Sequence, residues 1–123
     1  MSRSLVLKLT CGTDTLESLE RTAQALTVAA TAAASGTPVS LWLTGDATLL
    51  ATPLYAERLA LPHATSFAEL RDVLLDLQAV TVCTQCAVRR GLTDSDLLPG
   101  AHIAGAASFV EAALAEGAQA LVY

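Results

Sequence analysis

The chain has 123 residues, enough for one domain, because a single hydrophobic core commonly takes about 100 to 150 residues. Charged residues make up only 15% of it, against about 25% in ordinary soluble domains, while apolar residues reach 53%. The net charge of −5, with no basic cluster larger than Arg89-Arg90, excludes a nucleic-acid backbone as partner. The shortage of charge predicts that one face is buried in a homo-oligomer.

No segment of the sequence is typical of a leader or a membrane anchor. The first apolar run, Leu5–Leu9, is too short for a signal-peptide core, and no stretch reaches the roughly 18 apolar residues that cross a bilayer. We therefore expect a cytoplasmic protein with no membrane partner. In that reducing setting, an odd set of three cysteines favours reactive or metal-binding thiols over a structural disulfide.

Hydrophobic patterning in the first part of the chain predicts a strand, a helix and a second strand. Cys11-Gly12 ends the first strand, and Asp14 with Glu17 resembles a capping box before the helix. Gly36 ends the helix, and Gly45-Asp46 forms a turn after the second strand. The predicted ranges are 4–10 for the first strand, 16–35 for the helix and 38–43 for the second strand.

The rest of the chain continues this alternation. Pro53 breaks a weakly helical stretch, and His63 is expected in an irregular connection or a brief strand. Ser66 with Glu69 forms a capping box for the next helix, and Pro99-Gly100 marks a loop. The predicted elements are a helix from 67 to 78, a strand over 79–83, a short helix over 84–90, a helix over 105–116 and a strand over 119–123.

Alternating strands and helices predict an α/β fold with a mostly parallel sheet and helices on both faces. In such folds, ligands and reactive groups gather beyond the carboxyl ends of the strands. Cys11 and Cys83 both follow or end a strand. If the first strand is central and lies beside the strand ending at Cys83, the two thiols face a shared crevice at one edge of the sheet.

Cys83 is the first candidate for chemistry. It stands at a strand-to-helix junction, where free N–H groups and the positive end of the helix dipole stabilise a thiolate. Cys86 follows one helical turn later and Arg90 four residues after that, so both add to the local field, while Asp46 either points into the same crevice or forms a turn. The inert alternative is that Cys83 and Cys86 are small apolar packing residues.

Other uses of the thiols remain open from the residues alone. One alternative is a structural zinc site, which needs four ligands. Another is a thioredoxin-like dithiol, but its motif stands before a long helix, and the helix after Cys83 is short. Neither a second cysteine pair nor a phosphate-binding glycine motif is present. We predict no metal and no cofactor. The possible zinc ligands are Cys11, Cys83, Cys86, His63 and His102.

The segment Val82–Thr93 resembles the active-site segment of the DsrE/TusD-like (DsrEFH-like) sulfur-relay family, in which a cysteine ends a strand and an Arg-Gly pair closes the short helix after it. Here that pair is Arg90-Gly91. Three further stretches are similar to the family's first strand and glycine turn, its second strand and the segment before its last helix: 5–12, 40–46 and 99–105.

The resemblance implies that residues 1–123 form a single DsrE-like domain, a Rossmann-like three-layer α/β/α fold with about five strands. It also implies a trimer or hexamer that exchanges sulfur with donor and acceptor proteins. Cys83 aligns with the cysteine that accepts sulfane sulfur as a persulfide, so a sulfurtransferase-like carrier is the leading hypothesis. Cys86 and Cys11 depart from the family pattern. The alternatives are a thiol-disulfide redox switch through Cys83 and Cys86, or a non-catalytic oligomeric module that binds a small ligand.

Overall fold

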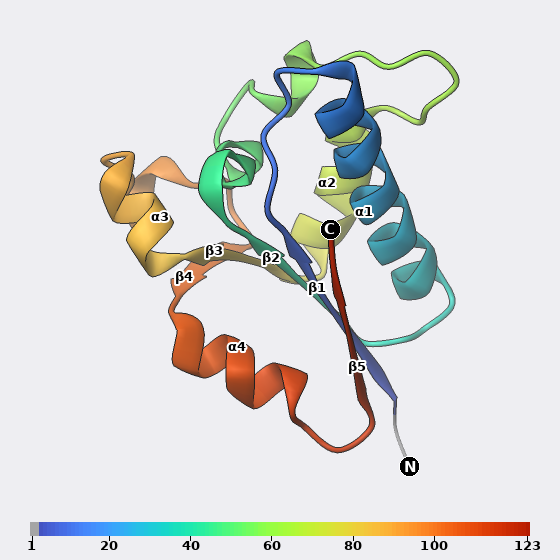
Figure 1. The fold of residues 1–123 in the computed structure, drawn as a ribbon, viewed down its shortest axis with the longest axis vertical. Helices are drawn as coiled ribbons and strands as arrows, with labels where there is room; N and C mark the ends of the chain where they lie inside the picture. Colours follow the sequence, from blue (N-terminus) through green and yellow to red (C-terminus); the bar gives the residue numbers. More distant parts are fainter. Residues whose placement is uncertain (1–2) are drawn as a thin grey trace.

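A sheet of five parallel strands forms the centre of the molecule, in the order β4-β3-β2-β1-β5 (Figure 1). The computed structural model describes residues 3–123, so the first two residues of the predicted 1–123 domain, Met1 and Ser2, lie outside it. The prediction of an α/β fold with a parallel sheet of about five strands is confirmed. The strands are β1 (Ser4–Leu9), β2 (Val39–Leu43), β3 (Val80–Cys83), β4 (Ala101–Ala104) and β5 (Ala118–Val122).

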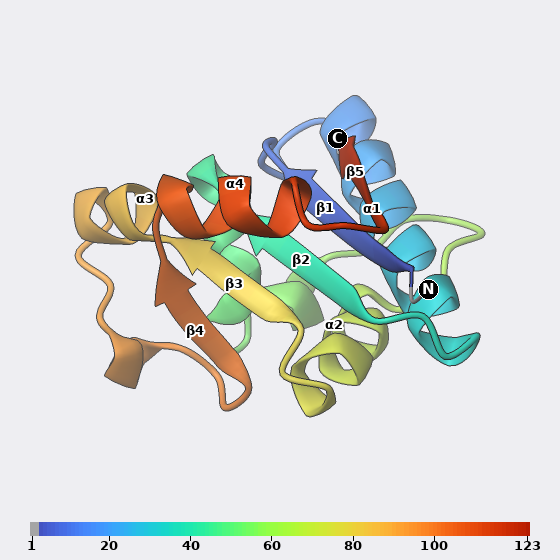
Figure 2. The same ribbon diagram turned by 90° about the horizontal axis from the view of Figure 1, so that it is seen from below.

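Helices cover both faces of this sheet. α1 (Leu16–Ala34) and α2 (Phe67–Asp76) lie on one face and α4 (Ala106–Ala113) on the other, while α3 (Thr84–Arg89) follows the end of β3 (Figures 1 and 2). The chain steps from β1 to β4 in one direction across the sheet and then returns from β4 to β5. Since crossovers are right-handed, the returning connection carries its helix over the opposite face. No helix within residues 3–123 is long and apolar enough to cross a membrane.

The main hydrophobic core lies between the sheet and the α1–α2 layer. Alternate residues of a strand face the same side, so the residues of β1 that point toward this layer are two positions apart. Large fully buried side chains from three strands and two helices fill it: Leu7, Leu9, Leu26, Leu41, Leu43, Phe67, Leu74, Val80 and Val82. The residues between them, among them Lys8 and Trp42, face α4 instead.

Several local predictions were wrong. The capping box of α1 consists of Thr15 and Ser18, not Asp14 and Glu17, because the Thr15 side chain accepts the Ser18 N–H and the Ser18 side chain accepts the Thr15 N–H. The residues after the Pro99-Gly100 loop, for which no strand was predicted, form β4, and His102 in this strand hydrogen-bonds through Nε2 to Thr81 Oγ1 at 3.0 Å. The predicted break at Pro53, by contrast, is confirmed, because short 3₁₀ helices lie on either side of it, at Gly45–Ala51 and Ala56–Arg58.

β4 escaped prediction because it has only four residues and none of them is a long apolar side chain except Ile103. The turn before it requires glycine. Gly100 has a φ of +97°, and a Cβ atom at this position would overlap the backbone carbonyl group of Leu75, at the end of α2. The close approach between this turn and α2 therefore fixes where β4 joins the sheet.

We predict that Gly100→Ala lowers the free energy of unfolding by roughly 2 to 4 kcal/mol, because backbone strain and overlap with Leu75 act together. Gly36→Ala is the matched control: Gly36 has a φ of +87°, but a Cβ atom added there would meet no other atom within 4 Å, so strain alone acts. Urea unfolding of both variants measures the difference. Equal losses in the two variants would contradict the packing role of Gly100.

Candidate functional site

A pocket of about 300 Å³ lies at the carboxyl ends of β1, β2 and β3, on the face covered by α4. Lys8 and Trp42 are register partners on β1 and β2, and Cys83 comes from the end of β3. All three face α4, because they occupy equivalent positions in the strand alternation. The full lining is Lys8, Trp42, Thr44, Cys83, Thr84, Gln85, Gly105, Ala106 and Phe109.

Cys83 is the last residue of β3 and the N-cap of α3. Its partial burial raises the pKa of the thiol, but the nearby backbone N–H and thiol of Cys86, the Gln85 N–H and the charge of Lys8 together lower it further than burial raises it. The net effect is a Cys83 pKa below that of an ordinary thiol. The thiolate is the nucleophilic form, so the site favours reactivity at Cys83.

Cys86 lies one turn into α3 and is only 8% exposed. Its Sγ accepts a hydrogen bond from the Gly45 N–H at 3.2 Å, and its thiol is among the groups that lower the pKa of Cys83. The Gly45 N–H therefore fixes the position of the sulfur that acts on Cys83.

Arg90 and Asp46 hold α3 against the loop that follows β2. The Arg90 guanidinium binds the Asp46 carboxylate through Nη2 at 2.8 Å and Nε at 3.1 Å, and it donates from Nη1 to the Cys86 carbonyl oxygen. Neither side chain lines the Cys83 pocket. The ion pair instead supports Gly45, next to Asp46, in its position against the Cys86 sulfur.

Cys11 does not share the Cys83 pocket, so the expected common crevice is wrong. β2 lies between β1, which precedes Cys11, and β3, which ends at Cys83. The Cys11 sulfur contacts α1, at 3.6 Å from both the Ser18 carbonyl oxygen and Thr22 Oγ1. Cys11, two positions after Leu9, thus lies on the α1 side of the sheet. Cys83, two positions after Thr81, lies on the α4 side. Within residues 3–123, no three or more His, Cys, Asp or Glu side chains come together in a way that could hold a metal ion.

Sequence reasoning missed the residues that form the rest of the pocket wall. The Lys8 ammonium lies 3.8 Å from the centre of the Phe109 ring, and Phe109 meets Trp42 edge to face, with ring centres 5.3 Å apart. One signal was available: Lys8 interrupts the apolar run of the first strand and is the only lysine in the sequence. Phe109 lies far along the chain, and only the position of α4 brings it to Lys8.

Comparison with known families agrees with this arrangement. The sequence model of the DsrE/DsrF-like family matches residues 10–123. The chain belongs to the DsrE/DsrF-like family. The resemblance noted in the sequence is therefore confirmed. No curated protein matches the chain in sequence.

The DsrE/DsrF-like fold is also seen in a solved structure. The crystal structure of the YchN protein from E. coli is similar over the full length of both chains, with a TM-score of 0.70 and 14% sequence identity. At this level of identity the similarity concerns the fold. It supports the arrangement of strands and helices described above and leaves the chemistry of the site to the residues of this chain.

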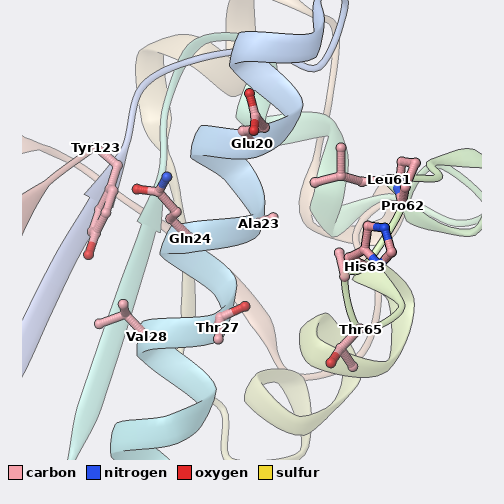
Figure 3. Close-up of a pocket in the computed structure, with 11 residues that line it drawn as sticks. Glu20, Ala23, Gln24, Thr27, Val28, Leu61, Pro62, His63, Thr65 and Tyr123 are labelled. Atoms are coloured by element: carbon pink, nitrogen blue, oxygen red, sulfur yellow. The ribbon is translucent and has the colours of Figure 1, made fainter.

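A larger groove, of about 510 Å³, contains no cysteine. Figure 3 shows that its residues are spread around α1, with Tyr123 on one side of the helix and Pro62 and His63 on the other. Such side chains do not converge on one point, as the groups of a reactive centre must. The smaller pocket around Cys83 is therefore the candidate functional site of this DsrE/DsrF-like chain.

We predict that the rate of Cys83 alkylation by iodoacetamide rises with pH around a midpoint below that of an ordinary thiol. Below its pKa Cys83 is protonated and reacts slowly. Because this pKa is lowered, the alkylation rate falls only at a lower pH than for an ordinary thiol. Cys86→Ala should raise the midpoint and slow the reaction at neutral pH by roughly three- to tenfold, the effect of losing an interaction of about 1 kcal/mol with the thiolate.

Cys86→Ser is the control, because a hydroxyl group can still donate to Cys83 and accept from Gly45. It should keep a midpoint close to that of the wild type. Peptide mass spectrometry separates the reaction of Cys83 from that of the other two cysteines. A midpoint unchanged in Cys86→Ala would show that Cys86 does not stabilise the thiolate.

Proposed function

We propose that this chain is a sulfur carrier that holds sulfane sulfur as a persulfide on Cys83 and passes it to a partner protein in the cytosol. The observation that carries the proposal is the Cys83 sulfur, with its lowered pKa, in the wall of the 300 Å³ pocket. Membership of the DsrE/DsrF-like family is consistent with a role in sulfur relay. The three free cysteines fit a reducing compartment, where such a thiol stays available.

The proposed transfer is a thiol exchange in two equivalent steps. The Cys83 thiolate attacks the outer sulfur of a donor persulfide; the S–S bond of the donor breaks, the donor leaves as a thiolate, and a new S–S bond forms on Cys83. A thiolate on the acceptor protein then attacks the outer sulfur on Cys83, and Cys83 leaves as a thiolate. Sulfane sulfur moves at its own oxidation state, so no other oxidant or reductant is needed.

The contact between Cys83 and Cys86 favours a second candidate, a thiol-disulfide switch. Attack by Cys86 on the Cys83 sulfur of the persulfide would form a Cys83–Cys86 disulfide and release hydrogen sulfide, which also balances. A direct disulfide from Cys83 to Cys11 fits the fold poorly, because the two sulfurs face opposite sides of the sheet. The switch predicts a disulfide after mild oxidation and no retention of sulfur by the protein.

A homo-oligomer, a trimer or hexamer, is part of the same proposal. α4 consists largely of apolar residues, yet none of its residues is buried. Val110 is 51% exposed and Leu114, just after the helix, 79%. An apolar surface of this kind is typical of an interface, and the sequence has too little charge to keep such a face in water. Copies of the chain covering α4 would also close one side of the Cys83 pocket.

Loading with a cysteine desulfurase and cysteine tests the carrier. We predict that intact wild-type protein gains the mass of one sulfur atom, that Cys83→Ala does not, and that Cys11→Ala behaves as the wild type. The reason is that Cys11 lies outside the pocket and its sulfur hydrogen-bonds within the α1 side of the fold. Equal gains in wild type and Cys83→Ala would rule out Cys83 as the carrier.

Sedimentation velocity tests the assembly. We predict that wild-type protein sediments as a trimer or hexamer and that Leu114→Asp dissociates it, since a carboxylate at a buried interface loses its hydration. Val73→Asp is the matched control: Val73 is 45% exposed on α2, at the opposite face of the sheet. A monomeric wild type, or equal dissociation by the two variants, would contradict an interface at α4.

A further inference from the structure

Lys8 combines features that an ordinary surface lysine lacks. It is the only lysine of the chain, and it extends from β1 into the pocket that contains Cys83. It is half-buried, and no carboxylate among residues 3–123 forms an ion pair with it. A cation in such surroundings attracts an anion from solution, because the partly apolar pocket screens its charge less than water does.

Aromatic side chains hold this cation in position. The Lys8 ammonium lies over the Phe109 ring, and Trp42 meets that ring edge to face, at an angle of 84°. A cation over an aromatic face is favourable, yet it keeps its charge and its hydrogen-bond donors. Trp42 is itself only 5% exposed, so the aromatic pair is a firmly packed part of the pocket wall.

We propose that Lys8 is the anion-binding residue of this pocket, which holds the negatively charged outer sulfur of the Cys83 persulfide and draws anionic sulfur donors toward Cys83. The inference rests on the proposed carrier function and adds the charge class of its donors. During the transfer, the Cys83 thiolate approaches a persulfide that is itself an anion. Lys8 reduces the repulsion between the two, and the bond changes remain those of the thiol exchange described above.

Two alkylating reagents of similar shape and different charge test the anion site. Iodoacetate is an anion and iodoacetamide is neutral, and both react with the same Cys83 thiolate, so the ratio of their rates does not depend on how much thiolate is present. We expect Lys8→Met to lower the iodoacetate-to-iodoacetamide ratio at Cys83 by about threefold or more at low salt. Lys8→Arg, which keeps the charge, should retain most of the ratio.

Arg21→Met is the matched control, because it removes the same charge from α1, where Arg21 pairs with Glu17 on the far side of the sheet. It should leave the ratio unchanged. Raising the salt concentration should lower the wild-type ratio, a measurement that needs no variant to fold. An equal ratio in wild type and Lys8→Met, or a wild-type ratio insensitive to salt, would overturn the proposal.

The alkylation-rate ratio and the sulfur uptake test the anion site and the carrier function separately. If the wild type takes up no sulfur from the desulfurase but its ratio falls in Lys8→Met, the carrier function is wrong and the anion site stands. If the wild type takes up sulfur and the ratio does not respond, the carrier stands and the role of Lys8 is wrong. Phe109→Leu should lower the ratio in part, because Lys8 keeps its charge but loses the ring that positions it.

Discussion

Parallel alignment of β1, β2 and β3 is the constraint on which the site depends. Because the three strands run in the same direction and stay in register, their carboxyl ends meet at one edge of the sheet. Strand alternation then puts Lys8, Trp42 and Cys83 on the same face, away from the main core. The return of the chain from β4 to β5 brings α4 over that face and adds Phe109. Residues from opposite ends of the sequence thus come to surround one sulfur.

Local chemistry then decides the state of that sulfur. Burial alone would favour the neutral thiol of Cys83, and the N–H groups at the start of α3 with the Cys86 thiol reverse this preference. Gly45 holds the Cys86 sulfur, and the Arg90–Asp46 ion pair holds the loop of Gly45 against α3. The ion pair is largely exposed at Asp46, so its contribution is to geometry more than to stability.

The sequence was sufficient for the alternation of strands and helices, because long apolar runs and helical spacing are local signals. It also placed Cys83 at a strand-to-helix junction, which the structure confirms, since a cysteine at such a junction is visible in the pattern. Strand order was not available locally, which is why Cys11 was expected beside Cys83 although β2 separates their strands. The lysine–aromatic wall was missed for the same reason: Lys8 and Phe109 meet only through the return of α4. β4 was missed because a close approach of Gly100 to Leu75, rather than its own apolar residues, fixes it.

A crystal structure of the sulfur-loaded protein tests this account most directly. The extra sulfur should be bonded to Cys83 Sγ and lie inside the pocket, next to the Lys8 ammonium and under Phe109. An extra sulfur on Cys11 or Cys86, or one on Cys83 that points away from Lys8 into solvent, would contradict the account.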